Sequence, residues 1–205
     1  VAYQNNYYRP EIDTSEGPSY LEALDIVHPI IERIIDGPYI KNDVFIGRGT
    51  HIGKYIKDNC KDEELLKRRS KGIALFSVNA GGKSSISKAI GLNIIMAQIG
   101  CFTACKLKYK PYHKIITRIS GDDNMFAGES SFCVEMNELR TILRQSDSHT
   151  LIIGNEISKG SDNISALGIT TSTILSLLNK NATFIFSTHI HELMELPEIK
   201  ELDIG

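Results

Sequence analysis

The feature that most constrains the fold is a series of short apolar segments that alternate with helical patterns from residue 73 onward. Each apolar segment has the length of a buried strand, and the segments cover residues 73–77, 114–120, 150–154 and 182–188. Between them, apolar residues recur at helical spacing. Apolar strands separated by helices are typical of a parallel sheet that is covered on both faces. The sequence therefore predicts an α/β domain with a mostly parallel sheet flanked by helices.

The residues before this alternation give weaker signals. Residues 1–18 are polar and contain two prolines, so we interpret them as a linker or the tail of a preceding element, and residues 19–205 as the domain. Proline followed by spaced isoleucines predicts a short amphipathic helix over residues 29–35. Residues 49–71 are rich in charge and indicate an exposed excursion.

Composition narrows the class of protein. Apolar residues make up 41% of the chain and charged residues 23%, which is ordinary for a globular domain. The net charge of −2 argues against a main DNA-binding surface, which needs clustered Lys and Arg. No apolar run has membrane-spanning length, so a membrane partner is not expected. The four cysteines lack disulfide spacing, and no second Cys or His pair completes a zinc site at Cys101 and Cys105, so buried reduced thiols are favoured over a metal site. Reduced thiols indicate an intracellular compartment, without distinguishing cytoplasm, nucleus, mitochondrion or viral factory.

A glycine-rich segment at residues 79–85 lies between a predicted strand and a predicted helix. Glycines let backbone N–H groups approach a phosphate, and the helix N-terminus favours the anion. Lys83 would reach the β- and γ-phosphates, and the Ser84 hydroxyl would bind Mg²⁺. The strict phosphate-loop pattern requires glycine where this chain has Ser77, so a simple Gly-Gly turn before a helix remains the alternative.

Two further apolar strands end in residues suited to nucleotide chemistry. Asn155 and Glu156 follow the strand at 150–154, where an acidic pair usually supports Mg²⁺ and polarises the attacking water. Here Asn155 can hold a metal-bound water without supplying charge, and Glu156 is the candidate general base. His189 follows the strand at 182–188 and is placed to sense the γ-phosphate. The alternatives are a strand that merely ends in polar residues and, for His189, half of a metal site.

Ser130 precedes the helix expected over residues 132–143, and a serine there can bind an anion or serve as an ordinary N-cap. The order of the four sites is more specific than any one of them.

These residues resemble the MutS family of DNA mismatch-repair proteins. The segments AGGKSS, MAQIGCFTAC, TRISGDDNMFAGESSFCVEM, NEISKGSD and STHIHEL are similar to that family's ATPase signatures, in order and at similar spacing. Upstream, the segments YYRPEI, VHPIIE and PYIKND resemble the part of the family's sequence that leads into this domain. The resemblance therefore covers nearly the whole chain. Within the family, the segments ISGDDNMFAGESSF and THIHEL are most similar to the branch known from giant viruses and coral mitochondria.

The resemblance implies an ABC-type P-loop ATPase domain that uses ATP, ADP and Mg²⁺ and is completed by a second MutS-type subunit. Residues 1–18 then become the tail of a clamp or lever region, and both chain ends look like truncations. Tyr39 matches the aromatic residue that stacks on adenine, and Gln98 lies near a loop thought to sense metal and nucleotide. Ser130 would act in trans, Glu156 would activate water, and His189 would sense the γ-phosphate. The residues that would bind phosphates and Mg²⁺ are Asn79, Ala80, Gly81, Gly82, Lys83, Ser84, Ser85 and, through water, Asn155. The segment that would face the partner is Lys159, Gly160, Ser161 and Asp162.

The expected function is ATP binding and hydrolysis that drives rearrangement of a dimer and a DNA clamp, with mismatched double-stranded DNA held by domains outside this chain. Two departures from the family pattern matter: Ser77 adds a Cβ in a tight turn, and Asn155 removes a charge near Mg²⁺. A nucleotide-gated dimerisation module that does not hydrolyse ATP is therefore the alternative. Another ABC-type motor is disfavoured because SSFCVEM replaces an LSGG-like signature.

Overall fold

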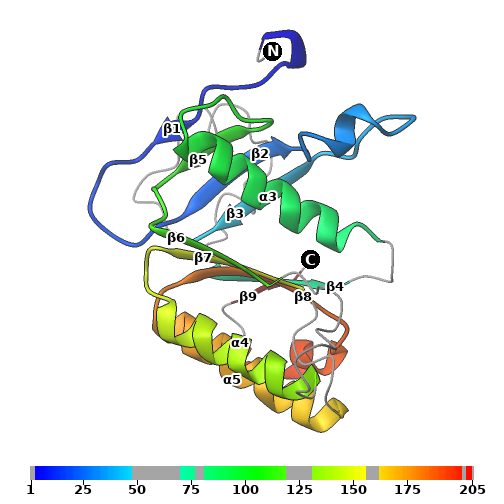
Figure 1. Cartoon of the computed structure of the whole chain (residues 1–205), viewed down its shortest axis with the longest axis vertical. Helices are drawn as coiled ribbons and strands as arrows, with labels where there is room; N and C mark the ends of the chain where they lie inside the picture. Colours follow the sequence, from blue (N-terminus) through cyan, green and yellow to red (C-terminus); the bar gives the residue numbers. More distant parts are fainter. Residues whose placement is uncertain are drawn as a thin grey trace.

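The computed structural model describes residues 3–47, 70–76, 81–118, 131–155, 162–199 and 202–204. These residues form two sheets with helices between and below them (Figure 1). The first sheet has the order β1 (Glu11–Ile12), β5 (Lys106–Tyr109), β2 (Leu21–Ile26) and β3 (Asn42–Ile46). The second has the order β6 (Lys114–Arg118), β7 (Thr150–Asn155), β8 (Thr183–Thr188), β4 (Gly72–Phe76) and β9 (Leu202–Ile204). The main helices are α3 (Lys83–Gln98), α4 (Ser131–Gln145) and α5 (Asn163–Asn179).

Every strand pair of the second sheet is parallel, which confirms the predicted parallel sheet flanked by helices. Its strands are apolar throughout because both faces are buried. On β7, Ile153 packs in the cluster that contains α3, whereas Ile152 packs with α4 and α5. On β8, Ile185 and Phe184 divide between the two clusters in the same way. Successive residues of a strand point to opposite faces, so an apolar run without alternation is what this position in the fold requires.

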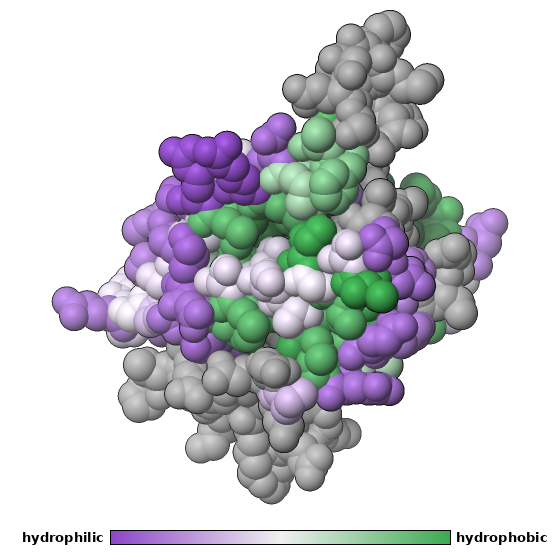
Figure 2. All heavy atoms as spheres, turned by 90° about the horizontal axis from the view of Figure 1, so that it is seen from below, coloured by the Kyte–Doolittle hydropathy of each residue, from purple (hydrophilic) through white to green (hydrophobic). Residues whose placement is uncertain are grey.

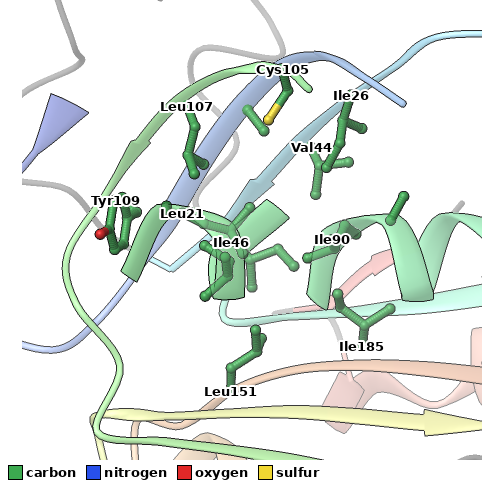
Figure 3. Packing of buried hydrophobic residues seen from close by; sticks show 14 of the residues in the cluster. Leu21, Ile26, Val44, Ile46, Ile90, Cys105, Leu107, Tyr109, Leu151 and Ile185 are labelled. Atoms are coloured by element: carbon green, nitrogen blue, oxygen red, sulfur yellow. The ribbon is translucent and has the colours of Figure 1, made fainter. Parts of the chain in front are cut away.

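Helix α3 lies between the two sheets (Figure 1). Its buried side chains, such as Ile90, meet β2 and β3 on one side and Leu151 and Ile185 on the other (Figure 3). Asn93 fixes the helix to the first sheet, because its side chain donates to the Val27 carbonyl at 3.1 Å and accepts from the Ala104 N–H at 2.7 Å. These contacts fix α3, and with it the residues at its N-terminus.

The antiparallel part of the first sheet was not predicted. Strand β2 pairs antiparallel with β3 and β5, and β1 joins the other edge of β5. Tyr8 forms an isolated bridge with Thr103, so part of the polar N-terminal segment hydrogen-bonds to the domain. The division at residue 18 stays a prediction. Most of the predicted excursion at residues 49–71 lies outside the described residues.

The helix predicted over residues 29–35 is wrong in extent, because the structure has only the 3₁₀ helix Ile31–Arg33 there. The Nδ1 atom of His28 accepts the N–H groups of Ile30 and Ile31 at 3.3 and 3.2 Å, which caps a single turn. The Ile34 side chain is 73% exposed. No apolar face is therefore buried that would stabilise a longer helix. Other 3₁₀ helices are Tyr3–Asn5, His191–Glu195 and Pro197–Ile199.

The prediction of buried thiols holds for one of the described cysteines. Cys105 is buried, and burial raises the pKa of its thiol to about 12, so the thiol stays protonated at neutral pH. The prediction is wrong for Cys101 and Cys133, which are exposed on the described surface, and Cys60 lies outside the described residues.

The outer face of α4 and α5 carries apolar side chains surrounded by hydrophilic ones (Figure 2). Between the helices runs a groove of about 630 Å³, lined by residues that include Met136, Leu139, Leu143 and Ile169. The described part of the chain leaves this groove open. No helix in the described ranges is both long and apolar enough to cross a lipid bilayer.

An ion pair at the amino-terminal edge of the parallel sheet predicts a pH-dependent stability. The Lys114 ammonium lies 2.9 Å from the Asp147 carboxylate, which also accepts from the Thr150 hydroxyl at 2.8 Å. These bonds, Lys114 first, lower the pKa of Asp147 to about 2. The carboxylate therefore stabilises the fold above its unfolded pKa of about 3.9, and this contribution is lost as the pH falls toward 2.

We expect Asp147→Asn to destabilise the protein by about 1 kcal/mol at pH 7, a small value because both side chains are nearly half exposed. Urea denaturation from pH 7 down to pH 3 should show the difference from wild type shrinking below about pH 4. A difference that stays constant over this range contradicts the assigned role of the carboxylate.

Candidate functional site

The carboxyl ends of the parallel strands bring the predicted sites to one edge of the sheet. Strand β8 lies between β7 and β4, and Thr188 is paired with Phe76 while Ser187 is paired with Asn155. The chain leaves these strands toward the glycine-rich segment, toward His189 and toward Glu156. The three segments therefore start from adjacent strands at the position where open parallel sheets bind ligands.

The glycine-rich segment ends at the N-terminus of α3. Gly82 has φ +87° and precedes Lys83, the first helical residue. A Cβ at Gly82 would meet no atom within 4 Å, so its backbone conformation, and not lack of space, favours glycine. No side chain among the described residues caps this helix end. Lys83 is half-buried and Ser84 is exposed, while Ser77, Asn79 and Ala80 lie outside the described residues.

Tyr39 comes to the first turn of α3 from the segment before β3. Its hydroxyl oxygen lies 3.5 Å from the Ser85 Oγ atom, and its ring is half-buried. The structure therefore brings the predicted adenine-stacking residue together with the predicted phosphate-binding residues, although they are far apart in the sequence.

Asn155 is held from both sides at the end of β7. Its side-chain oxygen accepts a hydrogen bond from the buried Ser187 hydroxyl on β8. Its backbone carbonyl accepts from the guanidinium of Arg118, the last residue of β6, at 3.4 Å. Glu156, the candidate general base, lies outside the described residues.

His189 is exposed directly after β8. The Thr188 hydroxyl accepts the Ile190 N–H at 3.1 Å and so fixes the backbone on both sides of His189. The His191 ring stacks on the ring of Phe76, the last residue of β4, with 5.6 Å between ring centroids, so His191 packs against β4. Within the described ranges, no group of three or more His, Cys, Asp or Glu side chains is arranged to hold a metal ion.

Gln98 is not brought together with the other predicted residues. It ends α3, about 22 Å from Lys83 at the helical rise per residue. Its side chain donates to the Tyr112 carbonyl at 3.0 Å and accepts the Tyr112 N–H at 2.7 Å. These two bonds fix the chain that leads into β6, so a direct nucleotide contact of Gln98 is not part of the site that we propose.

The segments predicted to face a partner are described only in part. Ser130 lies outside the described residues, and α4 starts at the next residue. Residues 159–161 also lie outside them. Asp162 caps α5, because its carboxylate accepts the Ser165 and Ile164 N–H groups at 3.1 Å each. Hydrogen bonding from Ser165, and to a smaller extent from Ile164, lowers the pKa of this carboxylate.

Two contributors to this edge were missed from the sequence, Ser187 and Arg118. Ser187 was part of a motif noted for its histidine, and only its register with Asn155 shows what its hydroxyl binds. Arg118 ends an apolar strand, and a charge at a strand end is an ordinary pattern. Its partners become visible only when β6, β7 and α4 are placed in space.

Comparison with known proteins identifies relatives that cover nearly the whole chain. A MutS homologue for DNA mismatch repair from Acanthamoeba polyphaga mimivirus is 39% identical over 221 residues, covering 99% of this chain and 20% of that protein. A mitochondrial DNA mismatch repair MutS homologue from Sarcophyton glaucum is 33% identical, covering 96% of the chain and 18% of that protein. DNA mismatch repair protein MutS from Fusobacterium nucleatum is 34% identical, covering 99% and 20%. The chain thus spans about a fifth of the length of these relatives.

The family model of MutS domain V matches residues 73–203, which include all five strands of the parallel sheet apart from the first residue of β4 and the last of β9. That domain is the ABC-type ATPase domain of the family. The chain therefore belongs to the MutS family, and its residues 73–203 correspond to domain V of that family.

Proposed function

We propose that this chain is the ATP-binding and ATP-hydrolysing domain of a longer MutS-like DNA mismatch-repair protein. The observation that carries the proposal is the shared edge of β4, β8 and β7, where the glycine-rich segment, His189 and the Asn155–Glu156 pair leave adjacent strands. Three separate sequence signals at one edge, beside Tyr39, are difficult to explain by structural needs alone.

The N-terminus of α3 fits a nucleotide phosphate. The helix end carries partial positive charge, and the described residues place no side-chain cap in front of it. Lys83 supplies the positive charge for the β- and γ-phosphates, and Asn79, Ala80, Gly81, Gly82 and Ser85 complete the loop. The Tyr39 hydroxyl oxygen lies 3.5 Å from the Ser85 Oγ atom, and the Tyr39 ring stacks on adenine. Mg²⁺, when bound, supplies charge neutralisation between the phosphates. It would be held by Ser84 and, through water, by Asn155.

Hydrolysis then needs a positioned water molecule. Glu156 accepts a proton from the water, whose oxygen attacks the γ-phosphorus while the bond to the β–γ bridging oxygen breaks and ADP leaves. His189 lies at the end of the neighbouring strand and contacts the γ-phosphate. Most of the rate acceleration comes from positioning and charge neutralisation, which suits residues fixed at a rigid sheet edge.

The site is completed by a second MutS-type subunit, whose Ser130 equivalent contributes in trans. Nucleotide state then controls the arrangement of the dimer and of a clamp on mismatched double-stranded DNA. The net charge of −2 supports DNA contact through other domains. Residues 1–18 belong to a preceding clamp or lever region. The relatives from a giant virus and a coral mitochondrion support placement in that branch, and an intracellular location follows from the role in DNA repair.

A nucleotide-gated dimerisation module without hydrolysis is the second candidate. Asn155, in the position of a metal-supporting aspartate, favours it. Because the Asn155 side-chain oxygen is already bound to the Ser187 hydroxyl, its capacity to hold a metal-bound water is reduced.

The two candidates differ in the effect of Asn155→Asp in the full-length protein. If the protein is an ATPase, wild type turns over ATP, and the added charge lowers the half-saturating Mg²⁺ concentration by about fivefold to tenfold, roughly 1 kcal/mol of Coulomb attraction. The measurement is phosphate release against Mg²⁺ concentration. Asn181→Asp is the matched control, because it adds the same charge at an exposed turn before β8, at the opposite edge. Wild type that binds ATP without releasing phosphate, with turnover gained in Asn155→Asp, would establish the second candidate instead.

A further inference from the structure

One guanidinium group connects three elements at the edge of the parallel sheet. Arg118 Nη2 lies 2.9 Å from Glu135 Oε1, and Arg118 Nε lies 2.9 Å from Glu138 Oε2, both on α4. Arg118 Nη1 donates to the Asn155 carbonyl at 3.4 Å on β7. A single side chain at the end of β6 thereby holds α4 and the end of β7 together.

Burial makes the pair with Glu135 the decisive contact. The Arg118 and Glu135 side chains are 13% and 6% exposed, whereas Glu138 is 51% exposed. A buried charge is tolerated only with a well-placed opposite charge, while an exposed pair contributes little. Among the described contacts, the pair with Glu135 therefore contributes most to the position of the guanidinium. A lysine could neutralise Glu135 but could not reproduce the planar arrangement of donors that reaches three acceptors.

The elements that Arg118 connects are next in the sequence to two residues of the proposed site: Glu156, the general base, and Ser130, which would act on the nucleotide of the partner subunit. Asn155 directly precedes Glu156 in the sequence, and its side chain is held from the other side by Ser187. Helix α4 begins directly after Ser130, and Glu135 lies near its start. Arg118 thus joins the strand that leads to the general base with the helix that follows the residue acting in trans.

We propose that Arg118, paired with Glu135, is a positioning residue for hydrolysis: it fixes the end of β7, the strand that leads in the sequence to the proposed general base, relative to α4. This inference rests on the proposed ATPase function. The nucleotide-binding residues around Lys83 follow β4, which is separated from β6 by β7 and β8. Loss of Arg118 should therefore impair turnover and leave ATP affinity nearly unchanged.

The test is steady-state ATP hydrolysis by the full-length protein carrying Arg118→Lys. We expect kcat to fall by about tenfold to a hundredfold, the range that a small misplacement of a catalytic group produces. At saturating Mg²⁺, KM for ATP should stay within about twofold of wild type, because the phosphate-binding residues follow β4 and not β7. The denaturation midpoint should change little, since the ammonium still neutralises Glu135. The double variant Arg118→Gln/Glu135→Gln removes both buried charges together, and we expect the same loss of kcat if the lysine variant folds poorly.

Lys114→Gln is the matched control. Lys114 is the first residue of the same strand and forms an ion pair at 2.9 Å with Asp147, but at the opposite edge. Its kcat should equal that of wild type. A folded Arg118→Lys or double variant with wild-type kcat would overturn the positioning role, and so would a variant in which only KM rises. Wild type without turnover would overturn the inference together with the proposed function, and this outcome is recognised from wild type alone.

Discussion

Replacing Lys83 with alanine is expected to lower ATP turnover by at least about a hundredfold, because a charge that neutralises the transferring phosphate is removed. Lys83 begins α3 directly after the positive-φ Gly82, at the helix end where a phosphate would bind. The fold should not suffer, since alanine favours helix more than lysine does. Phosphate release and titration with a fluorescent ATP analogue measure the effect.

Lys88→Ala is the control for this prediction. Lys88 is exposed on the same helix, about 7.5 Å further along the axis, and its replacement removes the same charge away from the proposed site. Turnover should be retained in Lys88→Ala and lost in Lys83→Ala. Turnover at the wild-type rate, or ATP affinity equal to that of wild type, in Lys83→Ala would exclude the glycine-rich segment as the phosphate-binding loop.

Replacing Gly72 with alanine is expected to destabilise the domain by about 2–3 kcal/mol, the usual cost of overpacking a dense core. A Cβ at Gly72 would lie 2.3 Å from two ring atoms of Phe184. That ring is fully buried and lies 5.0 Å, centroid to centroid, from the Phe186 ring, so it has little room to move. Strand β4 is paired on both sides, and a shift of its backbone would disturb β8 and β9. The measurement is the urea midpoint.

The substitution Gly168→Ala should change the free energy of unfolding in the opposite direction. Gly168 is exposed within α5, and a Cβ there would meet no atom within 4 Å. Alanine should therefore stabilise the domain by about 0.5–1 kcal/mol through its helix propensity. A Gly72→Ala midpoint equal to that of wild type would contradict the close approach of β4 to Phe184.

The parallel half of the fold could be predicted from local patterns, whereas the antiparallel sheet could not. Strands β7 and β8 are continuous apolar runs, and their burial on both faces makes the sequence signal strong. Strand β5 instead carries Lys106 and Lys108, whose partners Asp25 and Glu11 lie at 2.9 and 3.8 Å on strands far away in the sequence. From the sequence alone, such charges predict a loop or a solvent-exposed segment, because their partners on the neighbouring strands are not known.

The same distinction explains what was predicted of the site. Asn155 and His189 were predicted because a polar residue at a strand end is a local signal, and Lys83 because a glycine-rich segment between a strand and a helix is another. Parallel strands place those ends together. The contact of Arg118 with Glu135 depends on how α4 packs beside β6, and no local pattern encodes it. Gln98 was carried over from the resemblance alone, and its bonds to Tyr112 show a role at the far end of α3.

The measurement that tests the central claim most directly is an equilibrium titration of the full-length protein with ATP in the presence of Mg²⁺. The shared edge of β4, β8 and β7 predicts saturable binding that ADP displaces and that Lys83→Ala abolishes. Phosphate release under the same conditions then separates an ATPase from a nucleotide-gated module. If the folded wild-type protein shows no saturable ATP binding, this edge of the sheet is not a nucleotide site, and the proposed function fails with it.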